Sequence, residues 1–340
     1  MFLDKRIKVA VCALLWVVTC SAYSAQDDYF PRYLIFTSDP QYPWTESSDH
    51  GWEESTSEKE RRSQWLIETQ YSDVANFRRN FSPVAAAIPV MINGDMTAFG
   101  HGHQRSTVKA LLEKKLGEDY DYGLGNHDYE NNVNDCQFPE NNCAAGSILD
   151  LKERYWGKVA SFDLAAREEG GSKVFYGSLA YSRVVGDIHL TQLNNEPTYS
   201  VSFSSGFPLN RVRYEVTDAL DWLERDLQRA RSAGRIIILN MHKPDRWKGS
   251  EQQIARFKAM IERYNVTAVF AGHLHNDPGR YFGWNREDYF GDVPVFLSGG
   301  ASNQTYLIVD VAPDRQSLKV HQVNGNNWPS RKEIAIIPVR

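Results

Sequence analysis

The chain is poor in cysteine and has no excess of positive charge. Four cysteines occur among 340 residues, and two of them lie in the apolar N-terminal segment, so the rest of the chain can form at most one disulfide. Lysine and arginine number 38 against 43 aspartates and glutamates, and no basic stripe stands out. This balance argues against a nucleic-acid-binding surface. No internal repeat or low-complexity tract occurs, and 42% hydrophobic residues suffice for a globular core.

The chain also lacks an apolar run of the length that spans a membrane. The run at residues 9–19 is shorter than the roughly 20 residues of a spanning helix. Basic residues precede it and small residues follow at 21–25, as in a secretory signal. We therefore expect a cleaved signal peptide at residues 1–25 and a secreted or periplasmic single domain at residues 26–340, with no transmembrane segment after cleavage. An uncleaved membrane anchor and a lipid anchor at Cys20 are the alternatives.

Cys136 and Cys143 would remain in the exported chain. They flank a short polar segment, and an exported protein with one close pair is expected to form a local disulfide. A redox or metal-binding pair is the alternative, but the spacing differs from the two-residue gap that such sites favour.

Strand-like runs and helical periodicity alternate in the first part of the chain. Apolar runs at residues 33–37, 85–92 and 120–124 predict strands, whereas residues 57–79 and 108–116 have helical spacing. This β-α-β-α-β order favours helices packed over a sheet.

The middle of the chain is richer in strands. Successive strand-like runs at residues 161–193 favour a second sheet or an antiparallel extension. Predicted helices at 216–231 and 254–264 then alternate with predicted strands at 235–239 and 266–270, and the tail again looks all-strand. No linker separates two domains. We expect two stacked sheets with helices outside.

Five short polar blocks follow apolar runs. They occupy residues 38–41, 93–95, 125–128, 241–242 and 272–275. Their carboxylates, carboxamides and imidazoles are ligands for Mn, Fe, Zn or Mg. Because strand ends gather at one edge of an α/β sheet, the blocks predict one shared site for more than one ion. Asp95 is suited to bridging two ions, because Gly94 before it lets the backbone pack closely.

In this order the blocks resemble the motifs of the calcineurin-like metallophosphoesterases, namely D-x-[H/Q], GD, GNH[D/E], a lone His and GHxH. The resemblance extends from Asp39 to His275. It implies an α/β fold, a four-layer α/β/β/α sandwich of two packed mixed sheets flanked by helices. It further implies one ion held by Asp39, Gln41, Asp95 and His275. It implies a second ion held by Asp95, Asn126, His242 and His273.

Gln41 departs from the histidine that usually ends the first block. Gln at this position is similar to a branch that includes the manganese-dependent ADP-ribose/CDP-alcohol pyrophosphatases. Residues 39–41 also resemble the calcineurin-like phosphoesterase-domain protein phosphatases. A carbonyl oxygen is a harder ligand than imidazole, which tilts the first ion toward Mn, Mg or Fe. We expect two divalent ions as cofactors, with Mn first and Fe, Zn or Mg as alternatives.

His127 and Asp128 are the candidate catalytic residues besides the ligands. An ion pair would yield a bridging hydroxide that attacks phosphorus, and would neutralise charge on the phosphoryl oxygens. His127 adjoins the ligand Asn126 without being needed as a ligand, so it is placed to protonate the leaving group. Asp128 is expected to orient a neighbour rather than to bind metal.

Residues near the first and fourth blocks are candidates for substrate contact. They are Tyr42, Trp44, Lys243 and Arg246. His101 and His103 imitate the GHxH block, but no strand precedes them, so we expect them at the rim or in solvent. His189 lies in a strand-like run and is expected to be structural.

Together these features favour an exported dinuclear-metal phosphoesterase that hydrolyses phosphate mono- or diesters. Its partner would be a phosphorylated small molecule or another phosphoester substrate. A pyrophosphatase acting on nucleoside diphosphate derivatives is an alternative, motivated by Gln41. A non-catalytic binding module on the same scaffold is a second alternative. A site that has lost its activity should also have lost ligands, however, and the expected ligand set is intact.

Overall fold

The structure, a computed structural model, describes residues 30–136, 138–283 and 286–340. The predicted signal peptide and Cys20 lie outside the described residues. The helices are α1 (Glu46–His50), α2 (Thr56–Phe81), α3 (Gly102–Leu116), α4 (Asn142–Tyr155), α5 (Leu220–Ser232), α6 (Glu251–Arg263) and α7 (Arg286–Phe290). Among the described helices, none has the length and apolar character needed to cross a membrane.

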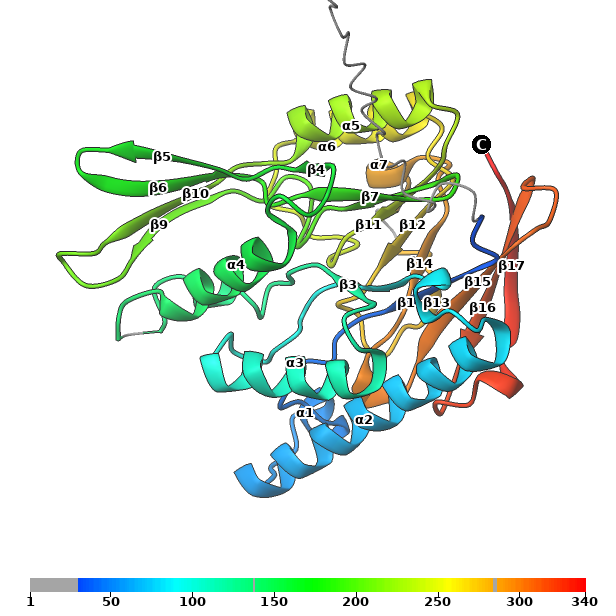
Figure 1. The fold of residues 1–340 in the computed structure, drawn as a ribbon, viewed down its shortest axis with the longest axis horizontal. Helices are drawn as coiled ribbons and strands as arrows, with labels where there is room; N and C mark the ends of the chain where they lie inside the picture. Colours follow the sequence, from blue (N-terminus) through cyan, green and yellow to red (C-terminus); the bar gives the residue numbers. More distant parts are fainter. Residues whose placement is uncertain (1–29, 137, 284–285) are drawn as a thin grey trace, which may run out of the picture.

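Two mixed sheets form the centre of the molecule (Figure 1). The first has the order β17-β16-β15-β1-β2-β3. Its strands are β1 (Tyr33–Thr37), β2 (Val90–Ile92), β3 (Asp121–Tyr122), β15 (Tyr306–Val311), β16 (Ser317–Val323) and β17 (Lys332–Pro338). The second has the order β13-β14-β12-β11-β8-β7-β4. Its strands are β4 (Ser161–Phe162), β7 (Tyr181–Val185), β8 (Ile188–Gln192), β11 (Ile236–Asn240), β12 (Ala268–Ala271), β13 (Gly279–Arg280) and β14 (Val295–Leu297).

An apolar core joins the facing sides of these sheets. Phe36 of β1 stacks on Phe270 of β12 with ring centroids 3.8 Å apart, and Leu34, Leu190 and Ile238 belong to the same buried cluster. Helices α2 and α3 cover the outer face of the first sheet, and α5, α6 and α7 cover that of the second (Figure 1). The predicted four-layer α/β/β/α order is therefore confirmed.

Each covering helix buries one stripe of apolar side chains, as the helical spacing of its apolar residues predicts. Tyr71, Val74 and Phe77 of α2 face the first sheet, and Leu223 and Leu227 of α5 face the second. The predicted helix at 216–231 begins only at Leu220, because the preceding strand runs to Val216.

A third sheet was not predicted. Its order is β5-β6-β10-β9, with β5 (Ala165–Glu169), β6 (Ser172–Gly177), β9 (Val201–Ser205) and β10 (Val212–Val216). It projects to one side of the sandwich, and α4 packs beside it (Figure 1). Apolar periodicity identifies strands but not their partners, so the expected two-sheet arrangement was incomplete.

The predicted local disulfide is present. It joins Cys136 to Cys143, with the two Cα atoms 5.7 Å apart. Cys143 lies in the first turn of α4, so the bridge fixes the start of this helix to the loop before it.

Candidate metal centre

The loops after five strands bring the candidate ligands together. They carry Asp39 and Gln41 after β1, Asp95 after β2, Asn126 after β3, His242 after β11, and His273 and His275 after β12. The first three strands belong to one sheet and the last two to the other, so the site lies where the two sheets end side by side.

The loops after β1 and β2 are joined by backbone hydrogen bonds. The Asp39 N–H donates to the Gly94 carbonyl at 3.1 Å, and the Gln41 N–H donates to the Asp95 carbonyl at 2.9 Å. Asp39, Gln41 and Asp95 have φ values of 52°, 39° and 49°, and His273 has 70°. Left-handed backbone is unfavourable for such residues and clusters at functional sites, where the surrounding structure holds it in place.

Glycines allow the carboxylates to approach the backbone closely. A Cβ atom at Gly125 would collide with the Asp95 carboxylate, and one at Gly272 would collide with Ser38 and lie 2.7 Å from Asp39 Oδ2. The glycines in the GNHD and GHLH blocks therefore make room for the two buried acids.

One half of the site is built around Asp95. Ligand atoms of Asp95, His242 and His273 lie within 4.8 Å of one another, an arrangement that can hold a metal ion. His242 Nε2 is 3.0 Å from both Asp95 Oδ2 and Asn126 Oδ1, while its Nδ1 is 2.8 Å from the Asn93 carbonyl. The carbonyl contact fixes the ring so that Nε2 faces the ligands.

The other half is built around Asp39. His275 Nε2 is 2.9 Å from Asp39 Oδ1, and the second oxygen of Asp39 accepts from the His273 N–H at 3.0 Å. Gln41 is buried, and its Oε1 has no hydrogen-bond partner among the described residues. A buried amide oxygen without a partner is costly, and a bound ion at this position would satisfy it.

The buried acids shift the pKa values of the imidazoles. Burial favours the neutral rings, but Asp95 and Asp39 outweigh it and raise the pKa of His242 to about 9. Asp39 and Asp49 similarly overcome burial and raise the pKa of His275 to about 10. Burial, with the charge of His242, lowers the pKa of His273 to about 4. The two carboxylates thus favour the positively charged forms of His242 and His275.

These residues fit a pair of divalent ions. They offer two carboxylates, two amide oxygens and three imidazoles, all suited to Mn, Fe, Zn or Mg. The unpartnered Gln41 oxygen and the room left by the glycines agree with that donor set.

His127 and Asp128 lie beside the ligands and have different surroundings. The His127 N–H donates to Asp95 Oδ1 at 2.8 Å, and His127 Nδ1 is 2.8 Å from the Ala98 carbonyl. Its ring is half-buried, and Nε2 is the nitrogen left for other contacts. Asp128 accepts from the backbone N–H groups of Met96, Thr97 and Gly125, each at 3.0 Å, so it joins the loops after β2 and β3. Burial and the charge of Asp95 raise its pKa to about 7.

The sequence reasoning missed Asp49 and the Asn93 carbonyl. Asp49 Oδ1 lies 2.7 Å from His275 Nδ1 and accepts from Trp44 Nε1 at 2.7 Å. Asp49 sits in an acidic segment that looks solvent-exposed, and no spacing rule connects it to a histidine 226 residues away.

The predicted substrate contacts differ in exposure. Tyr42 is buried in the core around α2, so its ring supports the loop from inside. Trp44 is half-buried, with its ring centroid 5.4 Å from that of His127 and 6.2 Å from that of His275. Lys243 is buried beside the centre, and Arg246 is exposed.

The remaining histidines lie apart from these ligands. His101 and His103 are exposed at the start of α3. His101 also lies near Cys136 and Cys143, but the disulfide removes the thiolates that a metal would need. His189 Nε2 is buried against Asp226 Oδ2 at 2.7 Å, which agrees with a structural role.

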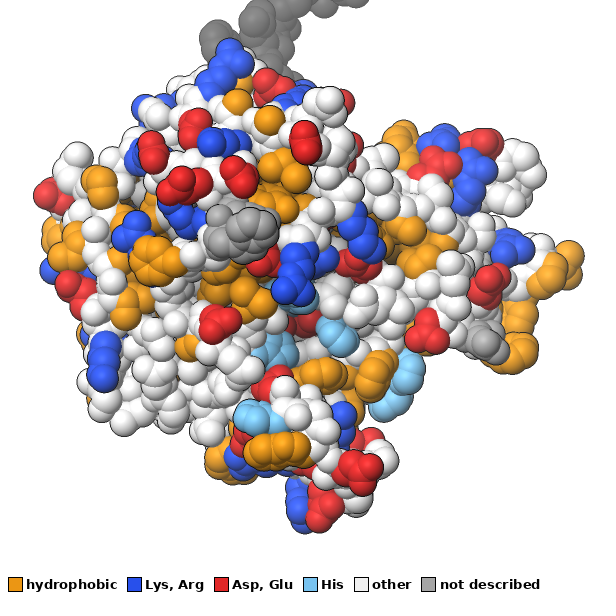
Figure 2. Space-filling view, turned by 180° about the vertical axis from the view of Figure 1, so that it is seen from behind, with side chains coloured by type: hydrophobic (Ala, Val, Ile, Leu, Met, Phe, Trp, Pro, Cys, Tyr) orange, Lys and Arg blue, Asp and Glu red, His pale blue; other side chains and the backbone are white. Residues whose placement is uncertain are grey.

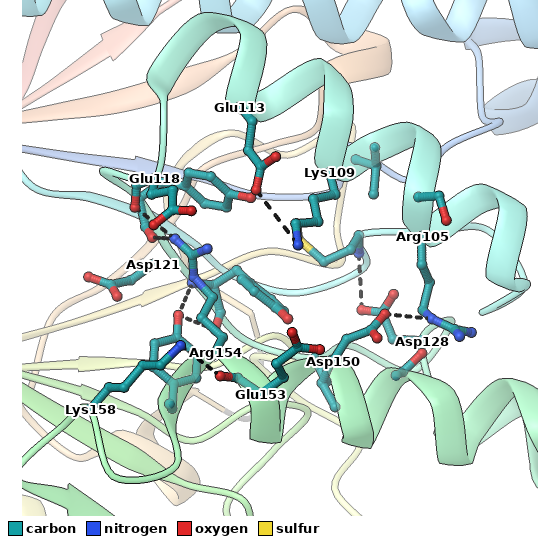
Figure 3. A pocket seen from close by; sticks show the side chains of 18 of the residues that line it. Arg105, Lys109, Glu113, Glu118, Asp121, Asp128, Asp150, Glu153, Arg154 and Lys158 are labelled. Atoms are coloured by element: carbon teal, nitrogen blue, oxygen red, sulfur yellow. Dashed lines mark hydrogen bonds and ion pairs between the residues drawn. The ribbon is translucent and has the colours of Figure 1, made fainter.

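The surface has a hollow with histidine side chains, and a cavity lies between two helices. Figure 2 shows histidine side chains gathered in a hollow that lysine, arginine and hydrophobic side chains border. A cavity of about 530 Å³ lies instead between α3 and α4, where Arg105 pairs with Asp150 (Figure 3). Asp128 lines it, but none of the seven candidate ligands does.

The fold and this buried ligand set define a metal-dependent phosphoesterase scaffold. A family model described as calcineurin-like phosphoesterase matches residues 34–277, and the chain belongs to this family.

Two solved structures match most of the chain at low sequence identity. One is described as GAP50, the anchor in the inner membrane complex of Plasmodium, with 10% identity, a TM-score of 0.48, and coverage of 89% of this chain and 88% of that chain. The other is Vps29 of Chaetomium thermophilum, with 8% identity, a TM-score of 0.29, and coverage of 90% and 95%. No curated protein matches the chain.

Proposed function

We propose that this chain is an exported metal-dependent phosphoesterase that hydrolyses phosphate mono- or diesters. The observation that carries the proposal is the buried ligand set, in which Gln41 Oε1 lacks a partner while Asp39 and Asp95 face histidines at about hydrogen-bond distance. Family membership supports the reaction class.

The seven candidate ligands would hold the ions in two sets that share Asp95. Asp39, Gln41 and His275 complete one set, and Asn126, His242 and His273 complete the other. Bound divalent ions supply Lewis acidity toward phosphoryl oxygens and lower the pKa of a water.

His127, Asp128 and Trp44 would act beside the bound ions. His127 is held through Nδ1 by the Ala98 carbonyl, which leaves Nε2 to hold a proton for the leaving oxygen. Asp128 fixes the loops that carry Asp95 and Asn126, so the ligands keep their positions. Trp44 lies edge-on to His127, with ring centroids 5.4 Å apart, and so borders the position of the leaving group.

The test combines chelation with a substrate panel. The purified full chain is assayed on phosphomonoesters, phosphodiesters and nucleoside diphosphate derivatives, each with Mn, Mg, Fe and Zn. Chelation should abolish hydrolysis and Mn should restore it. Asp95→Asn should remove most activity because one change damages both metal sets, whereas Asp314→Asn, in an exposed turn, should not. Full activity in metal-free protein would contradict the proposal.

A further inference from the structure

The loop after His242 carries three cations beside the candidate metal centre. This basic loop, residues 243–248, connects β11 to α6. Its Trp247 is buried, with its ring 5.0 Å from that of Phe257 and 4.6 Å from that of Tyr289. Trp247 Nε1 also donates to the Lys243 carbonyl at 3.0 Å. The aromatic anchor fixes the loop, and with it the positions from which the cations extend.

Glu130 organises two of the cations. Its Oε2 lies 3.6 Å from Lys243 Nζ and accepts from Asn195 Nδ2 at 2.6 Å, while its other oxygen pairs with Lys248. Lys248 is 66% exposed, and the exposed Arg246 makes no ion pair among the described residues. Two ammonium groups therefore share one carboxylate, and the Arg246 guanidinium has no ion-pair partner within the described part of the chain.

The other nearby acids point to internal partners. Asp245 Oδ2 accepts from the Tyr281 hydroxyl at 2.7 Å, and the buried Glu196 accepts from the Thr198 N–H at 2.6 Å. The charged side chains of the basic loop that are exposed, Arg246 and Lys248, are thus cationic, whereas Asp245 is half-buried. Such a surface attracts anions.

The basic loop flanks one half of the metal centre. It begins at the residue after His242, whose ring centroid lies 5.1 Å from that of His273. Glu130 lies in the turn that follows Asn126, where the Asn131 N–H donates to the Asn126 carbonyl at 2.8 Å. Figure 2 shows lysine and arginine side chains at the border of the hollow that contains the histidines.

We propose that the basic loop is an anion subsite for a second phosphoryl group of the substrate. The inference rests on the proposed function: the metal centre would take the scissile phosphoryl group, and Arg246 and Lys248 would take the next one. Both side chains bind phosphate oxygens by charge-assisted hydrogen bonds. The preferred substrates are then phosphoesters that carry a second phosphoryl group, because a substrate with one phosphate leaves the subsite empty.

Calorimetric titration of the Mn-loaded full chain tests the subsite directly. The probes are methylphosphonate, with one phosphoryl group, and methylenediphosphonate, with two. The variants are Arg246→Ala and Lys248→Ala, with Lys332→Ala, an exposed lysine on the far edge strand β17, as the matched control. Free Mn is held constant, so chelation by the probe is the same for every variant.

Wild-type protein should bind the diphosphonate at least about tenfold more tightly, a difference of about 1.4 kcal/mol. Each loop variant should lower the ratio of the two affinities about three- to tenfold, since exposed charges are partly screened. Lys332→Ala should preserve the ratio.

Equal affinities for the two probes, or the wild-type ratio in both loop variants, would overturn the subsite. Preferential diphosphonate binding without hydrolysis in the substrate panel would keep the subsite and refute the catalytic proposal. Hydrolysis of the panel substrates together with equal affinities for the two probes would keep the catalytic proposal and refute the subsite.

Discussion

Asp49 holds His275 by its Nδ1 atom, 2.7 Å away, while the Nε2 atom of the same ring faces Asp39 at 2.9 Å. Burial opposes the charge of Asp49, but hydrogen bonds and the positive charge of His275 keep its pKa below the ordinary value. A carboxylate in this position fixes the orientation of the imidazole and raises its basicity as a ligand.

Asp49→Asn should therefore weaken Mn binding about 10- to 100-fold, the usual cost of losing such a partner. The measurement is a Mn titration of the purified variant. His50→Ala is the matched control, because His50 is the next residue but is exposed and bonded only to the Glu46 carbonyl through Nδ1. An unchanged Mn affinity in Asp49→Asn would show that His275 needs no support.

Gln41→His should shift the metal preference from Mn toward Zn. Imidazole is a softer ligand than a carbonyl oxygen, so we expect the ratio of Zn to Mn affinity to rise about tenfold, or 1.4 kcal/mol. Gln228→His, on the exposed face of α5, serves as the control. Competition titrations of both metals measure the ratio. The same ratio in both variants would remove Gln41 from the ligand set.

His127→Ala should discriminate between leaving groups. An alkyl phosphoester needs a proton on the leaving oxygen, so the loss should be roughly 10²–10⁴-fold, whereas a p-nitrophenyl ester should lose much less. Metal content should stay near wild type, because the contact of His127 with Asp95 is made by its backbone N–H and survives the change. His103→Ala, an exposed histidine, should behave as wild type. Equal losses on both esters together with lost metal would indicate a structural role.

Asp226 should make stability depend on pH. Burial would raise its pKa, but hydrogen bonds and charge from His189 and hydrogen bonds from Ser182 and Thr191 hold it below the ordinary value. The pKa of Asp226 is thus lower in the folded state than in the unfolded state. Its stabilising effect is therefore complete above the unfolded-state pKa, about 3.9, and is lost as the pH falls below that pKa.

Asp226→Asn should cost about 3 kcal/mol of unfolding free energy at pH 7, as expected when a buried pair is broken. The difference from wild type should shrink below about pH 4, because the acid in the unfolded wild-type chain takes up a proton there while the folded one still resists it. Denaturant unfolding across pH measures both. Asp221→Asn on the same helix, with a side chain 78% exposed, should cost less than about 1 kcal/mol.

The candidate ligands could be proposed from the sequence because each one follows an apolar run. The runs before Asp39, Asp95 and His242 became β1, β2 and β11, and the parallel pairing of β1 with β2 brings Asp39 beside Asp95. Backbone groups such as the Asn93 carbonyl leave no trace in the residue pattern, because every residue carries one. Asp49 was missed because its burial depends on a contact with a residue far along the chain.

The third sheet was missed for a related reason. Strand β10 pairs in parallel with β6 and antiparallel with β9, and nothing in the periodicity of Val212–Val216 chooses these partners over the central sheets. Helix α4 begins beside the disulfide, in a polar segment that suggests only a loop.

The candidate ligands come from the loops of both central sheets, with Asp39 and Asp95 on one and His242 and His275 on the other. Ions bound there would connect the two halves of the sandwich, so separating the sheets would require releasing the ions. At a free metal concentration a hundred times the Kd, this linkage adds about 2.7 kcal/mol to the unfolding free energy. Metal supply would then govern how long the chain survives proteases, as well as whether it turns over substrate.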